Sequence, residues 1–196
     1  MQLVVTDFLS LDGVVQAPGG PDEDTDGGFA HGGWSMPFFD PTTMGPAIGE
    51  AMESAEALLF GRRTWQAMAA AWPERAGDPF ADRMNSIDKY VVSGSLSPED
   101  LALWNNSMLL PPGDVGPAVA ALKSSPGGEL QVWGSSELVR HLVSEDLVDG
   151  YLLMIEPILL GGGKRLFPDD GVARTLTLTG VTQASTGVLI VRYARQ

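Results

Sequence analysis

Apolar residues in this chain come in short runs separated by polar and glycine-rich breaks, and the spacing within each run predicts its secondary structure. Runs that are apolar throughout or at alternate positions are typical of β-strands, whereas apolar residues three and four apart are typical of helices. Strands are predicted at Gln2–Leu9, Leu58–Phe60, Lys89–Val92, Leu103–Leu109, Leu130–Trp133, Val148–Leu160, Thr175–Gln183 and Val188–Ala194. Helices are predicted at Thr42–Ala57, Arg62–Ala71 and Pro117–Lys123, and in the stretch that follows Ser136 as far as Val143.

The order of these elements predicts an α/β protein with a mixed, mostly parallel central sheet. Strands alternate with helices through most of the chain, which is typical of a sheet with helices on both faces. The last two strands flank a short break at Ala184–Gly187, so they predict an antiparallel hairpin. Gln2–Leu9 is apolar at odd and even positions, which predicts a strand buried on both faces. Pro157, within the predicted strand Val148–Leu160, indicates an edge or a bulge there.

Two segments are predicted as loops because glycine, proline and polar residues are frequent in them: Gln16–Pro41 and Pro73–Asp82. A loop as long as the first is usually functional or mobile in a compact domain. Its aromatic residues either close over a flat ligand or anchor the loop to the core: Phe29, Trp34, Phe38 and Phe39. Its acidic residues lack the alternating ligand positions of a calcium-binding EF-hand loop, so we interpret them as a solvated face: Asp22, Glu23, Asp24 and Asp26.

Composition limits the classes of protein to which the chain can belong. Its 196 residues suit one domain over 1–196, and 44% hydrophobic residues are typical of a globular protein. A net charge of −13 argues against DNA or RNA as a partner, because affinity for those backbones comes from clustered lysine and arginine. With no membrane-length apolar run, no signal-peptide pattern and no cysteine, we expect a cytoplasmic protein without a membrane partner or disulfides. Neither His31 nor His141 has partners at metal-ligand spacing.

Three predicted strands end at small residues beside hydroxyl or basic groups, and these ends are the main candidates for a binding site. Gly134-Ser135-Ser136 and Gly61-Arg62-Arg63-Thr64 each open a predicted helix. The first N–H groups of a helix have no partner within it and lie at the positive end of its dipole, so they favour a phosphate. Two arginines there oppose the dipole at a cost of about 0.3–1 kcal/mol each, which a bound phosphate would reverse. Together with Ser93-Gly94-Ser95, these ends predict a dinucleotide site.

Each of these signals also has a plainer explanation. Serine at a helix start, such as Ser135 or Ser136, commonly only caps the helix. Asp12, after the first strand, either lies in the ligand crevice expected at the carboxyl ends of parallel strands or only shapes a turn with Gly13. The triple glycine at 161–163 does not have the spacing of a phosphate-binding P-loop.

Several segments together resemble the dihydrofolate reductase superfamily: LLFGRRTW at Leu58–Trp65, the strand ending in Ser93, VWGSSELV at Val132–Val139 and EPILLGGGKRLF at Glu156–Phe167. Within it, SLDG at Ser10–Gly13 and the PILLGGGKRLF segment look most like the C-terminal reductase domain of the bifunctional riboflavin-biosynthesis deaminase/reductase. The resemblance covers nearly the whole chain and leaves no room for a deaminase domain, whose zinc-binding His and Cys signature is also absent. The chain is therefore similar to stand-alone members of that reductase family.

This resemblance implies a dihydrofolate-reductase-like fold and an NADPH-dependent reductase similar to 5-amino-6-(5-phosphoribosylamino)uracil reductase. It implies that Arg62, Arg63 and Ser93 bind the adenosine 2′-phosphate. It assigns the pyrophosphate to Thr64 and to the turn Gly134, Ser135 and Ser136, and it places the nicotinamide near Leu9–Val14. Gly61 is also a candidate cofactor-binding residue. Family members are commonly homodimers, and the C-terminal hairpin or an edge strand is the candidate interface.

The resemblance also bears on the substrate. Dihydrofolate reductases carry a pterin-binding carboxylate on the first helix, and Gly45 stands at the corresponding place here, so dihydrofolate is not the expected substrate. Riboflavin-type reductases hold a sugar phosphate with basic residues, a role for which Lys164 and Arg165 are candidates. Asp12 is the candidate proton donor. The candidate pocket walls are Trp34, Phe38 and Trp65.

The expected reaction is hydride transfer from NADPH to a C=N or C=O carbon of a small heterocyclic, pteridine- or pyrimidine-like substrate, or of a carbonyl compound. Two other hypotheses stay open. One is a nucleotide- or pterin-binding module of the same fold without turnover, which the missing pterin carboxylate favours. The other is a structural dimerisation domain that binds no cofactor.

Overall fold

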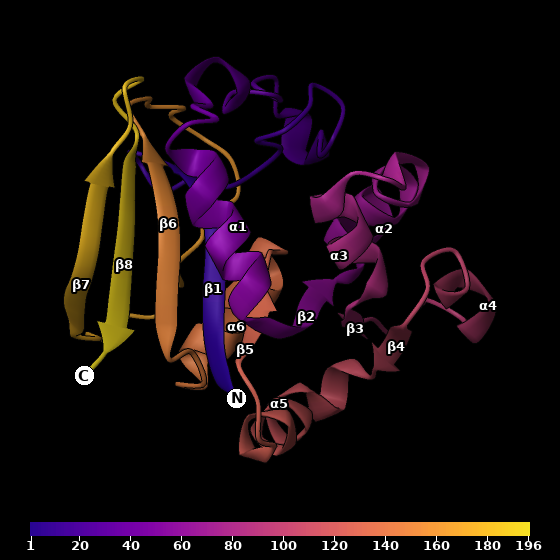
Figure 1. Ribbon diagram of the computed structural model, residues 1–196. Helices are drawn as coiled ribbons and strands as arrows, with labels where there is room; N and C mark the ends of the chain where they lie inside the picture. The colour runs from indigo at the N-terminus through magenta and orange to yellow at the C-terminus, as the bar shows by residue number, and fades with distance from the viewer.

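A computed structural model describes residues 1–196, which form one eight-stranded sheet with helices on both faces (Figure 1). The strands lie in the order β4-β3-β2-β5-β1-β6-β8-β7, with bounds β1 Gln2–Ser10, β2 Ala55–Gly61, β3 Asp88–Val92, β4 Ser107–Leu110, β5 Glu129–Val132, β6 Gly150–Glu156, β7 Leu176–Gln183 and β8 Leu189–Arg195. Neighbouring strands from β4 to β6 are parallel, whereas β8 is antiparallel to both β6 and β7. The predicted fold class and the predicted hairpin are confirmed.

The helices divide between the two faces of the sheet. Their bounds are α1 Met44–Ser54, α2 Arg62–Ala71, α3 Pro79–Ser86, α4 Pro98–Leu101, α5 Val115–Ser124 and α6 Ser136–Ser144, with 3₁₀ helices at Asp26–Gly28, Met36–Phe38, Pro73–Arg75 and Pro112–Asp114. Leu59 of β2 packs in the core cluster of α5 and α6, whereas Leu58 and Phe60 pack with Trp65 of α2 and Met84 of α3 on the other face. None of the helices has the length and the apolar character that a membrane-spanning helix requires.

β1 lies in the middle of the sheet, hydrogen-bonded to β5 on one side and β6 on the other. Successive side chains of a strand point to opposite faces. Leu3, Val5 and Leu9 accordingly belong to the α5–α6 cluster, whereas Phe8 packs against the cluster that contains α1. Burial on both faces explains why this strand is apolar at odd and even positions.

The first helix is shorter than predicted. The expected helix over Thr42–Ala57 is wrong at both ends, because α1 covers Met44–Ser54 and Ala55 already pairs with Glu129 of β5. No threonine hydroxyl caps the helix. Instead, the Asp40 carboxylate accepts the Thr42 N–H at 2.9 Å and organises the turn before the helix.

Two short helices occur where the sequence analysis predicts a loop or a strand. α3 starts within the predicted loop Pro73–Asp82, with the Asp78 carboxylate accepting the N–H groups of Phe80 and Ala81 at 3.0 Å each. α4 precedes β4, and Ser97 and Asp100 form a reciprocal capping box at its start. The predicted strand Leu103–Leu109 is therefore displaced to Ser107–Leu110. In both helices proline stands at the first position, which suits a helix start although it also resembles a loop signal.

β6 ends earlier than predicted and is not an edge strand. It covers Gly150–Glu156 within the expected Val148–Leu160, and it pairs with both β1 and β8. Pro157 has no N–H to donate to a neighbouring strand, so the ladder stops just before it. Proline here marks the end of an interior strand rather than an edge or a bulge.

Glu156, the last residue of β6, is a fully buried acid beneath the first long loop. Its Oε1 accepts the Ser35 hydroxyl, whereas its Oε2 has no hydrogen-bond partner. Burial raises the pKa of Glu156 to about 7. The Glu156 carboxyl thus binds its proton more tightly in the folded protein than in the unfolded chain. This proton binding contributes to the free energy of unfolding at low pH, and the contribution is lost as pH rises from the usual glutamate range through about 7.

We therefore expect Glu156→Gln, which stays neutral, to raise the melting temperature more at pH 8 than at pH 5. A difference of about 1 kcal/mol corresponds to roughly 2–4 °C for a chain of this size. Thermal unfolding of the wild type and of Glu156→Gln at pH 5 and pH 8 measures this difference, and Glu53→Gln, at an exposed position, is the control. The same temperature shift at both pH values would contradict the assigned cause.

Candidate functional site

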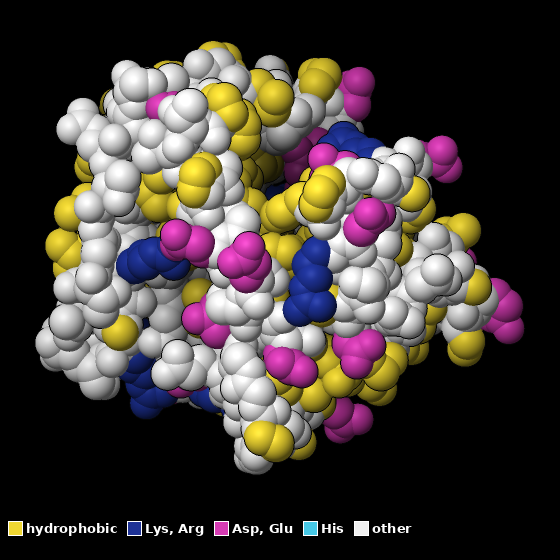
Figure 2. All heavy atoms as spheres, viewed as in Figure 1, with side chains coloured by type: hydrophobic (Ala, Val, Ile, Leu, Met, Phe, Trp, Pro, Cys, Tyr) yellow, Lys and Arg dark blue, Asp and Glu magenta, His cyan; other side chains and the backbone are white.

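A cleft of about 1260 Å³ opens at the carboxyl ends of the central parallel strands. It is lined by Gly61 at the end of β2, Ser93 after β3, Gly134 after β5 and residues Thr6–Phe8 of β1. Figure 2 shows the hollow between the two halves of the molecule, with hydrophobic side chains inside it and charged side chains at its edge. Pockets for one drug-sized ligand hold about 300–1,000 Å³, so this cleft has room for a long ligand together with a second, small one.

Two glycines bring the ends of β2 and β5 into direct contact. The Gly61 N–H donates to the Gly134 carbonyl at 3.1 Å. A Cβ at Gly61 would lie 2.3 Å from Ser135 Oγ, and one at Gly134, where φ is +95°, would lie 3.1 Å from Thr64 Oγ1. A side chain at Gly61 would therefore separate the turns, and one at Gly134 would also be strained. The two turns support each other.

This contact sets the N-termini of α2 and α6 side by side in the cleft wall. Gly61 and Ser135 are the N-cap residues, and neither helix has a side-chain cap. Their first-turn N–H groups are thus left for another acceptor, at the positive ends of two helix dipoles. The alternative that Ser135 or Ser136 only caps α6 is not what the geometry shows. Uncapped paired N-termini in a cleft fit the pyrophosphate of a dinucleotide.

The end of β3 completes the wall. The Ser93 hydroxyl accepts the N–H groups of Ser95 at 3.1 Å and Leu96 at 3.0 Å, which shapes the turn after the strand. All the residues expected to bind the cofactor line this one cleft: Gly61, Arg62, Arg63, Thr64, Ser93, Gly134, Ser135 and Ser136. The structure thus brings together segments that lie far apart in the sequence.

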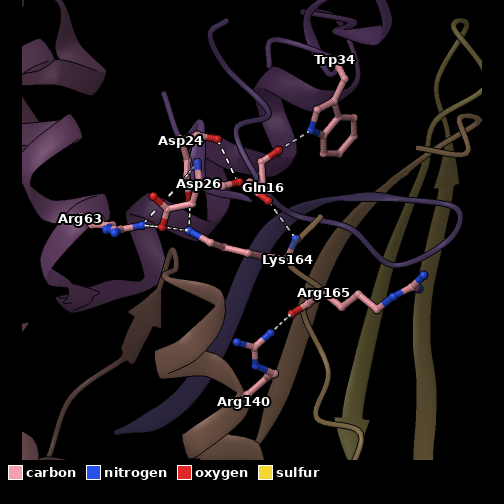
Figure 3. Close-up of polar contacts among 8 residues, drawn as sticks. All are labelled: Gln16, Asp24, Asp26, Trp34, Arg63, Arg140, Lys164 and Arg165. Carbon is pink, nitrogen blue, oxygen red and sulfur yellow. Dashed lines mark hydrogen bonds and ion pairs between the residues drawn. The ribbon is translucent and has the colours of Figure 1, made fainter. Parts of the chain in front are cut away.

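The two arginines of α2 differ in their surroundings. Arg62 bonds only to Gln66 Oε1, at 3.1 Å, and has no acidic partner. The Arg63 guanidinium instead forms an ion pair with Asp26 and lies 3.6 Å from Asp24 Oδ1 (Figure 3). Arg62 therefore keeps its charge free for an anion, whereas Asp26 already neutralises Arg63.

Lys164 joins the same group of charges. Its Nζ pairs with Asp24 and, at 2.9 Å, with Asp26 (Figure 3). The interpretation of the acidic run as a solvated face is incomplete for these two residues: Asp26 is exposed, and both also pair with cations from distant segments. We call Asp24, Asp26, Arg63 and Lys164 the charge cluster.

Gln16 holds the loop that carries the two aspartates. Its Nε2 donates to the carbonyls of Asp24 and Asp26 at 3.0 Å each, and its Oε1 accepts the Lys164 N–H at 3.0 Å. The Trp34 Nε1–H donates to the Gln16 carbonyl at 2.7 Å, and the indole is buried. Trp34 thus anchors the loop, which leaves Met36 and Phe39 of that loop to line the cleft.

The three aromatic residues expected to form the substrate pocket do not line the cleft. Trp34 anchors the loop, Phe38 packs against the α1 cluster, and Trp65 is fully buried beneath α2 with its Nε1–H donating to Ser107 Oγ at 2.9 Å. The aromatic residues that line it are Phe8, Phe39, Trp72, Phe80 and Trp133. Of these, Trp133 could have been predicted from the sequence, because it directly precedes Gly134.

Asp12 also lies outside the cleft and closes a turn. Its Oδ1 accepts the Ser10 hydroxyl at 2.7 Å and the Leu160 N–H at 3.1 Å, and its Oδ2 accepts the Gly161 N–H at 2.9 Å. These hydrogen bonds, the one from Ser10 above all, lower the pKa of Asp12 to about 2. An acid that is ionised at neutral pH and fully bonded suits the turn-forming alternative. Arg165, which donates to the Asp12 carbonyl, lies outside the cleft as well.

The part of β1 that reaches the cleft is Thr6–Phe8, not the segment Leu9–Val14 expected beside the nicotinamide. Asp7 is thus a cleft residue that the sequence analysis missed. Loss of hydration raises its pKa to about 8. The signal was a single acid in the middle of the apolar stretch QLVVTDFL.

Comparison with known proteins gives relatives over most of the chain. An uncharacterized protein of Bacillus subtilis (strain 168), YyaP, is 27% identical over 158 residues, 76% of this chain and 80% of that one. A second one from the same strain, YwjB, is 32% identical over 76 residues, 39% of this chain and 43% of that one.

Two solved structures share the fold. A putative riboflavin biosynthesis protein from Shewanella sp. PV-4 superposes with a TM-score of 0.76 at 20% identity, over 100% of this chain and 99% of that one. A pyrimidine reductase-like protein from Corynebacterium diphtheriae does so with a TM-score of 0.64 at 17% identity, over 100% and 92%.

The family model of the RibD C-terminal domain matches residues 2–190. That span includes the three strand ends, the first long loop and β7, and it ends at the start of β8. The resemblance inferred from short motifs is confirmed over the length of the chain. The protein belongs to the RibD C-terminal domain family.

Proposed function

We propose that the protein is a reductase that transfers a hydride from NADPH to a C=N or C=O group of a small heterocyclic, pteridine- or pyrimidine-like substrate. The observation that carries this proposal is the convergence of two uncapped helix N-termini and the free Arg62 in one cleft. Membership of the RibD C-terminal domain family supports it.

The cleft offers two separate places for the phosphates of such a cofactor. The N–H groups at the starts of α2 and α6, with the hydroxyls of Thr64, Ser135 and Ser136, suit a pyrophosphate. Arg62, with Ser93 across the cleft wall, suits the adenosine 2′-phosphate, because a free guanidinium forms strong charge-assisted hydrogen bonds. Arg63 contributes to phosphate binding only when its ion pair with Asp26 breaks.

Bound NADPH supplies a hydride from its dihydronicotinamide ring. The chain holds donor and acceptor together and keeps water away from them. The apolar side chains of Phe8, Ile48 and Phe39 line the cleft for this purpose. The loop held by Gln16 and the charge cluster closes one side of it.

The candidate basic residues give little support for a substrate that carries a sugar phosphate. Asp24 and Asp26 already neutralise Lys164, and Arg165 lies outside the cleft. We therefore favour a substrate without a phosphate near Lys164.

The second candidate function is a nucleotide- or pterin-binding module without turnover. It is favoured by α1, which presents Gly45 and Ile48 to the cleft and no acid. Both functions require a ligand to bind in the cleft, and only the reductase consumes NADPH.

We further propose that the protein is a homodimer that pairs through the outer part of the sheet. Leu178 and Val181 of the edge strand β7 are 52% and 58% exposed. Their partners Tyr193 and Val191 on β8 contact the α5–α6 core cluster, so the apolar face of the sheet continues uncovered to its edge.

Saturating NADPH should raise the melting temperature. A ligand at 100 times its Kd adds about 2.7 kcal/mol of stability, which corresponds to roughly 5–10 °C here. Differential scanning fluorimetry with NADPH and with buffer alone makes the comparison. An unchanged melting temperature at millimolar NADPH would rule out the reductase and a module that binds this nucleotide.

Arg62→Ala should weaken NADPH binding at least about tenfold, since a charge-assisted hydrogen bond contributes about 1.5–3 kcal/mol. NADH, which lacks the 2′-phosphate, should lose little. Arg63→Ala is the matched control and should discriminate less between the two cofactors, because Asp26 neutralises Arg63. Titration calorimetry gives the affinities, and equal losses for NADPH and NADH in Arg62→Ala would refute the assignment of Arg62.

Leu178→Asp with Val181→Asp should convert the dimer to a monomer, because charges on an apolar interface cannot be solvated there. Sedimentation velocity reads the mass directly. A monomeric wild-type protein, or a variant that remains dimeric, would show that this face is not the interface.

A further inference from the structure

Asp7 interrupts a row of apolar side chains at the floor of the cleft. Leu3, Val5 and Leu9 lie on one face of β1 in the α5–α6 core cluster, and strand alternation puts Asp7 on the same face. β5 pairs with β1 only as far as Val5, whereas β6 continues past Asp7. β1 therefore extends beyond its neighbour on one side, and Asp7 borders the opening that this leaves.

The Asp7 carboxyl has no partner from elsewhere in the chain. Its hydrogen bond comes from the N–H of the next residue, Phe8, to Oδ1 at 2.9 Å. Even partial burial of a carboxyl without a cation or further donors is costly, and Asp7 has no hydrogen bond or ion pair from elsewhere in the chain to offset that cost.

The other acids of the cleft are placed differently. Glu23 Oε2 accepts the N–H groups of Gly19 at 2.7 Å and Gly20 at 3.1 Å, and Asp24 and Asp26 belong to the charge cluster. Glu137 is exposed on the first turn of α6. Asp7 is thus the partly buried cleft acid that has no partner from elsewhere in the chain.

We infer that Asp7 is the catalytic acid of the proposed reductase: its carboxyl hydrogen-bonds to the heterocyclic substrate and donates the proton that accompanies the hydride. This inference rests on the proposed function. A protonated carboxyl offers a donor and an acceptor side by side, which matches a ring nitrogen next to an N–H group. The α1 wall, with Gly45 and Ile48, offers no acid that could do the same.

With a C=N substrate, a hydride adds to the carbon and a proton to the nitrogen. The carbon gains a hydrogen with its electron pair from the reduced nicotinamide, whose C–H bond breaks and which leaves oxidised. The π electrons of C=N move to nitrogen, which takes the proton from Asp7 Oδ2, since Oδ1 is engaged by the Phe8 N–H. The resulting Asp7 carboxylate regains a proton from water.

The electrostatics keep this acid neutral at physiological pH. Loss of hydration, with a smaller contribution from the Glu23 carboxylate, raises the pKa of Asp7 to about 8. Proton donation is therefore available below about pH 8 and lost above it. The other charged or titratable groups around the cleft are Asp24, Asp26, Arg62, Arg63, Arg75, Glu137, Arg140, His141 and Lys164.

The test compares Asp7→Asn with Asp12→Asn, which changes the turn-forming aspartate after the same strand. The probe is 2,4-diaminopyrimidine, which has a ring nitrogen beside an amino group, and the readout is quenching of Trp72 and Trp133 in the cleft. We expect the wild type and Asp12→Asn to bind equally well and Asp7→Asn to bind at least about tenfold more weakly, about 1.4 kcal/mol. Unweakened binding by Asp7→Asn, or no saturable binding by the wild type, would overturn the inference.

Two further measurements separate this inference from the proposed function. Carbon-13 NMR of aspartate-labelled protein should show one carboxyl titrating near pH 8 that is missing from Asp7→Asn. Asp7→Asn should keep the NADPH-induced rise in melting temperature. If the variant lost this rise, Asp7 would have only a structural role. Pyrimidine binding by the wild type without any NADPH effect would sink the proposed function and leave Asp7 as the recognition residue.

Discussion

The close approach of Gly61 and Gly134 is the contact on which the site depends. A hydrogen bond of 3.1 Å joins the two turns, and at Gly61 any side chain would meet Ser135. Because β2 and β5 are parallel neighbours, their carboxyl ends reach the same edge of the sheet, and the helices that follow begin side by side. Parallel pairing and two small residues thus produce a doubly positive wall from segments more than seventy positions apart in the chain.

The charge cluster links the first long loop to that wall without locking it. Arg63 and Asp26 have side chains 52% and 47% exposed, and ion pairs so open to water contribute only about 0–1 kcal/mol each. A phosphate can therefore compete with Asp26 for Arg63 at modest cost. Gln16 supplies the firmer hold, since it is buried and its side-chain bonds join both aspartates to the backbone of Lys164.

Local signals in the sequence predicted the strand ends and the fold class correctly, because glycine before a helix and alternation along a strand are properties of a few neighbouring residues. Pairing of Asp24 and Asp26 with Arg63 and Lys164 depends on the path of a long loop, which no local pattern encodes. The prediction that Trp65 lines the substrate pocket was wrong, because helical spacing alone does not show which face of the helix packs on the sheet.

The two aspartates of the first strand region show the same limit. The sequence placed Asp7 within a buried strand and made Asp12 a candidate crevice residue. In the structure, β5 ends early and leaves Asp7 at the cleft, whereas the Asp12 carboxylate is bonded within a turn. Strand length relative to a neighbour decides this, and it is a property of the whole sheet.

We propose that the starts of α2 and α6 together hold a dinucleotide phosphate. Backbone amide NMR during titration with NADPH tests it most directly, because it reports on those N–H groups themselves. Saturable shifts should be concentrated at Gly61–Thr64 and Gly134–Ser136. Shifts confined to other surfaces, or none at these two turns while NADPH is bound, would contradict it.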